Sequence, residues 1–299
     1  MFAALFLFVS SLGAQAATAT PDLASYDWSV SAKPNLAAKP PPEEVVRSFV
    51  TKRYSQPDIG VEPLVNSFAF ADLRQSGTVS LVVSMEPTGP AGCGQLLIVD
   101  KVGGKFEGTW ISCGGSDNIG KSVIEISGKP VVVTYTDITP YYGAQARVVY
   151  VPVIWGWNGS SYVDMSRQFP GYYRQVLRGL QHEIASSPAS ADYARGPVRC
   201  EKIEADAIER FLGISPDAGI EDAIRWSQSS KPIDRIMAMG LFTSIGTPRA
   251  LDYLKAMTSD SDPQVARAAE GNLNALNSRG SAEDPVEKLG HLKVYMGPP

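Results

Sequence analysis

Apolar residues recur at helical spacing in the C-terminal part of the chain. They follow Pro232 and Pro263 and stand at Ile233, Ile236, Met237, Leu241, Val265, Ala268, Ala269, Leu273 and Leu276. Both prolines suit the first turn of a helix, where the missing N–H group has no partner to lose. Asp262 and Thr247 precede Pro263 and Pro248, where an oxygen-bearing side chain can cap free N–H groups. The pattern predicts three helices between residue 232 and about residue 277.

Other helices are predicted upstream of this region, at about 43–54, 171–186, 199–213 and 217–229. The helix at 171–186 has an apolar face made of Tyr173, Val176, Leu177, Leu180 and Ile184. We expect Pro216 and Asp217 to cap the helix at 217–229.

Short apolar runs separated by Gly, Asn, Asp or Pro occupy residues 64–165, which is typical of β-strands. The expected strands are 65–71, 78–84, 95–100, 105–112, 122–127, 130–136, 146–155 and 160–164. Tight turns between so many short strands predict an antiparallel meander, built as two four-stranded blades, a sandwich or an open barrel. The fold class is therefore α+β, with an antiparallel β domain followed by an α-helical domain.

The C-terminal helices repeat along the sequence. A shift of 31 residues places Pro232 on Pro263, Ala238 on Ala269 and Gly240 on Gly271. With these matching residues, the segment resembles HEAT-like (PBS-lyase-type) helical repeats. A spacing of this length lies near the short end of helical-repeat periods. The resemblance implies stacked helix pairs that bind partners and do not catalyse. An ordinary helical bundle is the alternative.

Residues 70–83 resemble a segment of FG-GAP or VCBS-type β blades. In those families an Asp-rich loop before the second strand binds calcium through oxygen ligands at alternate positions. Here Asp72 and Gly77 hold their places, but Arg74 stands where an oxygen ligand belongs, and its charge would repel a cation. The resemblance implies a strand–turn–strand unit without a metal site.

The N-terminus is expected to direct export. Residues 1–12 are almost wholly apolar and are followed by Ala14-Gln15-Ala16, a small-x-small cleavage pattern typical of a signal peptide. The protein is then periplasmic or extracellular; a retained N-terminal anchor is the alternative. No later apolar run is long enough to span a membrane, so the mature chain should contain no span.

Length and composition suit two globular domains. The chain has 299 residues, 44% of them hydrophobic, and a net charge of −4. Scattered Lys and Arg residues argue against nucleic-acid binding. The expected boundaries are a signal peptide at 1–16, a Pro/Ala-rich linker at 17–42, a β domain with an N-terminal helix at 43–169, a helical HEAT-like domain at 170–277 and a flexible tail at 278–299.

The chain contains three cysteines. Cys93 and Cys113 flank an expected hairpin whose turn lies near Gly103, midway between them. An exported protein would then join them in a disulfide, although two reduced buried thiols are the alternative. Cys200 begins a helix and is expected to be buried and inert.

Catalytic equipment is scarce. Only two histidines are present, His182 and His291, which rules out a multi-His metal site in one chain. Residues 115–122 match a phosphate-loop pattern, but β-like segments lie on both sides of it, where a phosphate loop leads into a helix. We expect no catalytic residues, no cofactor, no metal and no nucleic-acid partner.

Aromatic residues gather late in the β region, at Tyr135, Tyr141, Tyr142, Tyr150, Trp155 and Trp157. Carboxylates near strand ends are Asp72, Glu86, Asp100, Asp117, Asp137 and Asp164. Exposed aromatics that flank two carboxylates would favour a carbohydrate-binding or carbohydrate-cleaving module. Core packing and turn formation are the alternative explanations.

The leading interpretation is an exported, non-enzymatic protein-interaction or structural module that uses a helical-repeat surface to bind an unidentified protein. Arg249 and Arg267 lie near helix starts, where the helix dipole disfavours positive charge. They are therefore candidates for an interaction surface.

Overall fold

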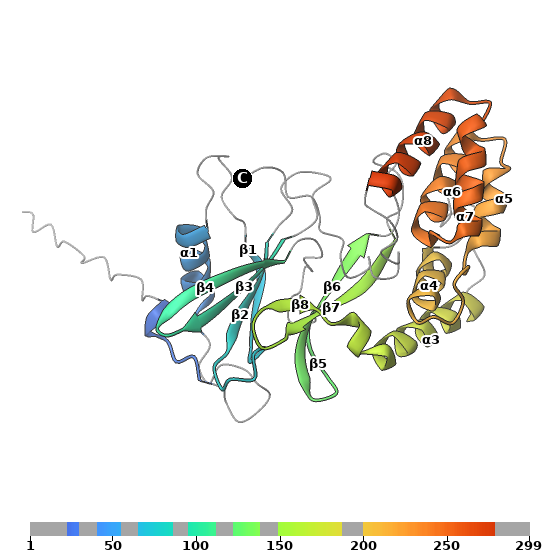
Figure 1. Ribbon diagram of the computed structural model, residues 1–299. Helices are drawn as coiled ribbons and strands as arrows, with labels where there is room; N and C mark the ends of the chain where they lie inside the picture. Colours follow the sequence, from blue (N-terminus) through green and yellow to red (C-terminus); the bar gives the residue numbers. More distant parts are fainter. Residues whose placement is uncertain are drawn as a thin grey trace, which may run out of the picture.

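A computed structural model describes residues 23–29, 41–54, 65–85, 95–111, 122–137, 149–186 and 200–278. The expected signal peptide at 1–16 and nearly all of the expected tail at 278–299 lie outside these residues. After one helix at Glu43–Tyr54, all the strands come before the remaining helices, which confirms the α+β fold class (Figure 1).

All eight expected strands are present, in two antiparallel four-stranded sheets in which neighbours along the chain pair. Sheet one contains β1 (Val65–Ala71), β2 (Ser80–Met85), β3 (Gln95–Val102) and β4 (Lys105–Ile111). Sheet two contains β5 (Val123–Ile126), β6 (Lys129–Asp137), β7 (Tyr150–Trp157) and β8 (Tyr162–Asp164).

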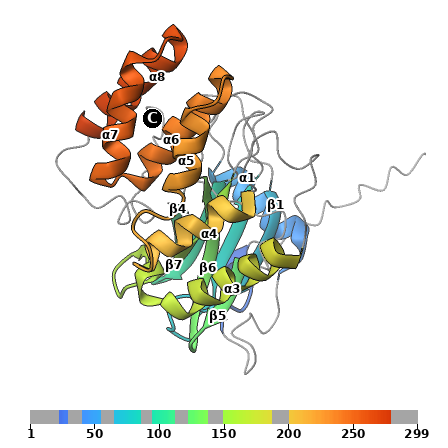
Figure 2. The ribbon, with the colours of Figure 1, turned by 90° about the vertical axis from the view of Figure 1, so that its right-hand side faces the viewer.

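The two sheets pack face to face, and helices cover their outer faces (Figure 1). Helix α1 (Glu43–Tyr54) covers sheet one, while α3 (Pro170–Ser186) and α4 (Cys200–Phe211) cover sheet two (Figure 2). The central strands carry apolar residues on both faces, as in Leu96 to Val99, because both faces are buried. Helices thus cover the outer faces of both sheets, where a further β-sheet would have to pack if the two sheets were blades in a longer row.

The predicted linker does not hold for residues 23–29. Leu23 and Trp28 are buried in the core between α1 and sheet one. The backbone of this segment also bonds to sheet one, since Val79 N donates to Trp28 O at 2.9 Å and Ser29 forms a bridge with Thr78. Burial of two large apolar residues and these backbone bonds together hold the segment on sheet one.

Every expected helix is present. The helices after α4 are α5 (Ile220–Ser227), α6 (Pro232–Ile245), α7 (Pro248–Ala256) and α8 (Pro263–Ser278). Asp262 and Thr247 cap α8 and α7 as expected. The expected cap of α5 is wrong: Gly219 is its N-cap, at a φ of 89°, and the Asp217 carboxylate accepts a hydrogen bond from Thr247 Oγ1 at 2.6 Å.

Helices α5 to α8 form their own hydrophobic core, while α3 and most of α4 share a core with sheet two. The expected boundary at residue 170 therefore does not separate two cores. Within the C-terminal core, α6 packs against α8, and Ala238 and Ala269, which are 31 residues apart, are both fully buried.

The same spacing reaches back to α4, a relation that the sequence analysis missed. Ala207 precedes Ala238 by 31 residues, and Phe211 precedes Phe242 likewise. However, Phe211 packs on Tyr173 of α3, with ring centroids 4.4 Å apart. Helix α4 thus repeats the sequence pattern while it serves mainly as a cover for sheet two.

The expected turn at Gly103 is present. β3 pairs with β4 from Leu96 with Ile111 to Val102 with Lys105, so the hairpin is centred between Gly103 and Gly104. A disulfide between directly opposite residues would need a centre on Gly103 itself. Cys93 and Cys113 lie outside the described residues, and their pairing stays a prediction.

Candidate functional site

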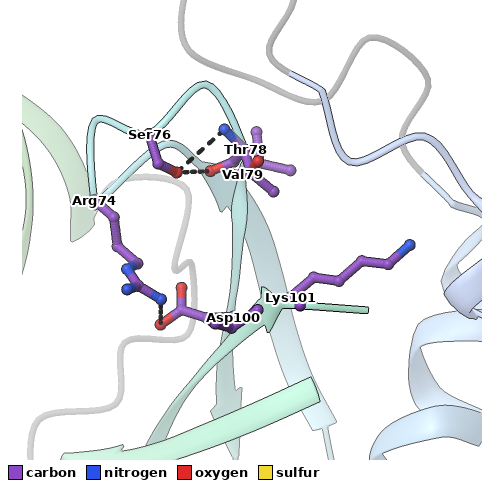
Figure 3. A pocket seen from close by; sticks show the side chains of 8 residues that line it. Arg74, Ser76, Thr78, Val79, Asp100 and Lys101 are labelled. Atoms are coloured by element: carbon purple, nitrogen blue, oxygen red, sulfur yellow. Dashed lines mark hydrogen bonds and ion pairs between the residues drawn. The ribbon is translucent and has the colours of Figure 1, made fainter. Parts of the chain in front are cut away.

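A pocket of about 230 Å³ opens where the loop between β1 and β2 meets the end of β3. Arg74, Ser76, Thr78, Asp100 and Lys101 contribute its polar side chains (Figure 3). Arg74 points toward Asp100, while Lys101 points away from it and donates to Ala24 O at 3.0 Å (Figure 3). Ser76 Oγ is held by the backbone of Thr78.

Asp100 forms a buried link between the two sheets. Its Oδ1 accepts hydrogen bonds from Ser80 Oγ at 2.5 Å and from the Tyr162 hydroxyl at 3.0 Å. Ser80 lies on β2 and Tyr162 on β8, so the carboxylate joins sheet one to sheet two. Burial, and next the Asp100 charge, raise the pKa of Tyr162, which therefore remains a hydrogen-bond donor.

Arg74 supplies positive charge to this link. Its guanidinium lies 3.9 Å from Asp100 Oδ2 and 4.1 Å from the ring centroid of Trp157 on β7. The Asp72 carboxylate accepts the N–H groups of Ser76 and Gly77, each at 2.8 Å. The loop that resembles a calcium-binding blade is thus closed by the chain's own groups, and the pocket lies within a structural joint.

A second surface lies on the outer face of sheet two. Tyr135 is 43% exposed and Tyr150 is 50% exposed. β6 and β7 pair Tyr135 with Pro152 and Asp137 with Tyr150. In a sheet, residues opposite one another share a face, and so do residues two positions apart on one strand. The two tyrosines are therefore diagonal neighbours on one face of sheet two, the face whose other part is covered by α3 and α4.

The third tyrosine of this surface is Tyr172 on helix α3. The Tyr173 hydroxyl donates to Pro152 O at 2.7 Å, directly across from Tyr135. The ring of Tyr172 lies 5.6 Å from that of Tyr173. Burial raises the pKa of Tyr172 to about 12, with smaller contributions from Tyr135 and Glu204.

Glu204 on α4 completes the surface, which we name the tyrosine–glutamate face: Tyr135, Tyr150, Tyr172 and Glu204. Burial first, and then the negative charges of Glu201 and Glu183, raise the pKa of Glu204 to about 7. Within the described chain, Glu204 has no hydrogen-bond or ion-pair partner. Tyr135 and Tyr150 are the exposed members of this face, whereas Tyr172 and Glu204 are half-buried.

Glu204→Gln is expected to change how stability depends on pH. In the folded state the Glu204 carboxyl keeps its proton up to about pH 7, whereas a glutamate in the unfolded chain loses its proton at about pH 4.3. Wild-type stability should therefore fall as pH rises through this window, and the loss is full above pH 7. Glutamine does not ionise. We expect the variant to match the wild type near pH 4.5 and to exceed it by about 1–2 kcal/mol at pH 8, an amount reduced by partial exposure.

Urea unfolding followed by circular dichroism at pH 4.5, 6 and 8 measures this difference. Glu270→Gln, on the exposed side of α8, is the control for the loss of one carboxylate. A stability difference for Glu204→Gln that stays constant with pH would contradict the assigned environment of Glu204.

The two arginines proposed from sequence lie in different surroundings. Arg249 Nη2 forms an ion pair with Glu221 Oε1 at 2.7 Å, which ties α7 to α5. Arg267 is exposed on α8. The aliphatic residues Ile214 and Ile233 are also exposed near these helices, at 58% and 49%.

Other candidates from the sequence are mostly engaged in the fold. Trp155 donates to Thr134 Oγ1 at 2.9 Å, and Trp157 packs on Tyr162. His182 is exposed on α3, and the Cys200 thiol is half-buried at the start of α4. The remaining candidates lie outside the described residues: Glu86, Asp117, Tyr141, Tyr142 and His291.

Sequence reasoning missed Tyr172 and Glu204. Tyr172 belongs to a helix whose apolar face was recognised, and Glu204 is one of several acidic residues on α4. Neither carries a local signal, because residues far apart in sequence create their environment.

No protein family, no curated protein and no solved structure matches the chain. Among the described helices, none is both long and apolar enough to cross a membrane. The described residues also include no group of three or more His, Cys, Asp or Glu side chains that could hold a metal ion. Function must therefore be inferred from the surfaces of the chain itself.

Proposed function

We propose that the protein is an exported, non-enzymatic interaction module that binds a protein partner through its C-terminal helices. The observation that carries this proposal is the relation between α6 and α8. Both begin at a proline, both bury an alanine at the same position 31 residues apart, and both contribute to one core. Stacked helices of this kind present a long shared surface.

The contacts between these helices support a rigid surface. Thr243 Oγ1 on α6 lies 3.3 Å from Asn272 Oδ1 on α8. Arg235 on α6 binds both carboxylate oxygens of Asp260, at 2.8 and 3.0 Å, and so fixes the turn before α8. Ile233 and Arg267 stand exposed on the two helices and offer apolar and charged contacts.

Site-specific photocrosslinking in cells that produce the protein tests this proposal. A crosslinking amino acid replaces Ile233 or Arg267, and the control replaces Glu107, which is exposed on β4 of sheet one. We expect the two helical positions to yield the same crosslinked partner and position 107 to yield none. Crosslinks from position 107 alone would place the interaction on the β layers and overturn the proposal.

A further inference from the structure

The turn between β7 and β8 contains the only Asn-Gly pair of the chain, Asn158–Gly159, and both residues are exposed. The two strands pair up to Trp157 and Tyr162, so the turn occupies residues 158–161. Gly159 has a φ of 105°, a conformation that residues with a side chain rarely adopt, so the turn requires glycine here. Glycine also leaves the backbone nitrogen of residue 159 open to approach.

Three hydrogen bonds hold the side-chain oxygen of Asn158. Its Oδ1 accepts from Ser160 N at 2.9 Å, from Ser160 Oγ at 3.0 Å and from Ser161 N at 2.9 Å. Within the described chain, neither Asn158 Nδ2 nor Gly159 N makes a hydrogen bond. The side-chain carbonyl of Asn158 is thus polarised by three donors, while the backbone nitrogen that follows it is not engaged.

We propose that the folded chain modifies itself at Asn158. The backbone nitrogen of Gly159 attacks Cγ of Asn158 and forms a five-membered succinimide ring. The proton of that nitrogen passes through water to the side-chain nitrogen, which leaves as ammonia. One water molecule then opens the ring and leaves aspartate or isoaspartate at position 158. The site is separate from the helical surface proposed above for a protein partner.

The hydrogen bonds at Asn158 Oδ1 favour this attack. Negative charge develops on the oxygen as the new C–N bond forms, and donors already aimed at it stabilise the charge without reorganisation. Because the reacting groups belong to neighbouring residues, no second molecule has to be brought to the site in the first step.

Asn272 on α8 shows the contrasting arrangement. It is half-buried, its Nδ2 donates to Ala268 O at 2.8 Å, and Leu273 follows it in the helix. The amide nitrogen that would have to leave is therefore bonded, and the helix fixes the backbone around it. Asn272 is the internal reference for the reactivity of Asn158.

The hairpin connects position 158 to the network around Asp100. Trp157 lies under the guanidinium of Arg74, at 4.1 Å, and the Tyr162 hydroxyl donates to Asp100 Oδ1 at 3.0 Å. Isoaspartate adds one methylene group to the main chain directly beside the Trp157–Tyr162 pair. We therefore expect isoaspartate to weaken the contact between the two sheets, whereas aspartate leaves the length of the main chain unchanged.

Incubation of the full-length protein at mildly alkaline pH, followed by peptide mapping with mass spectrometry, tests the reaction. We expect conversion at Asn158 to be at least about tenfold faster than at Asn272. Methylation of the product by an isoaspartyl methyltransferase distinguishes isoaspartate from aspartate.

A variant tests whether the hydrogen bonds assist the attack. Ser160→Ala removes one donor to Asn158 Oδ1 and keeps both backbone donors. It should slow the conversion by about threefold or more, the factor that corresponds to one hydrogen bond of ordinary net strength. Thr109→Ala, which removes an exposed hydroxyl on β4, is the matched control and should leave the rate unchanged.

Urea unfolding tests the consequence for the two sheets. The isoaspartate form, separated by chromatography, should unfold at a lower urea concentration than the variant Asn158→Asp, which carries the same charge on an unmodified main chain.

Three outcomes would overturn the proposal. Conversion at Asn158 that is no faster than at Asn272 would show that the turn does not promote the attack. A rate for Ser160→Ala that equals or exceeds that of the wild type would show that the hydrogen bonds do not assist it. Equal urea midpoints for the isoaspartate form and Asn158→Asp would show that the modification does not reach the sheets. None of these outcomes bears on the crosslinking test of the helical surface.

Discussion

Replacing Phe242 by alanine should lower the free energy of unfolding by about 3–5 kcal/mol. The side chain is fully buried on α6 and stacks on Tyr253 of α7, with ring centroids 5.4 Å apart and an angle of 6° between the rings. Its removal leaves a cavity at the point where α6, α7 and the rest of the C-terminal core meet. Chemical denaturation followed at 222 nm measures the loss, because the helices dominate that signal.

Ile233→Ala is the matched control for this substitution. It lies on the same helix and removes an aliphatic side chain, but the residue is 49% exposed and should cost less than about 1 kcal/mol. If the two variants lost similar amounts of stability, the C-terminal helices would lack the tight core described above.

Asp100→Ala should cost about 2–4 kcal/mol, because it leaves the buried hydroxyls of Ser80 and Tyr162 without their shared acceptor. Arg74 also loses its carboxylate partner at 3.9 Å. The two sheets share this network, so its loss should weaken their packing against each other. Thermal and urea unfolding compare the variant with the wild type.

A double-mutant cycle tests whether the network acts as a unit. Ser80→Ala and Tyr162→Phe should each cost about 1 kcal/mol alone and much less when added to Asp100→Ala. Glu107→Ala provides the control, since Glu107 lies opposite Asp100 in the ladder but is exposed. Fully additive losses would show that the three groups do not depend on one another.

The network around Asp100 and the tyrosine–glutamate face differ in how their charged groups are paired. At the joint, Asp100 and Arg74 find partners within the protein, and the pocket beside them follows from that arrangement. At the tyrosine–glutamate face, the negative charge of Glu204 meets further negative charge.

Local signals explain why the elements were predictable. Glycine or asparagine stands in the turns after β3, β5 and β7, at Gly103, Gly128 and Asn158. Pro232, Pro248 and Pro263 begin helices at their first turn. The cap of α5 failed as a prediction because Gly219, at a positive φ, starts the helix after Asp217. The linker prediction was wrong at residues 23–29 for a different reason. The composition of this stretch is typical of a linker, but Leu23 and Trp28 are buried against sheet one.

By itself, the sequence determined the order of strands and helices, the α+β class and the position of most turns, because short-range periodicity and turn residues encode them. Only the tertiary structure decided that the sheets stack between α1 and the α3–α4 pair, and that α4 covers sheet two. The hydrogen bond from Tyr173 on α3 to Pro152 on β7 arose in the same way. Contacts between residues so far apart depend on how whole layers pack, and no local pattern carries that information.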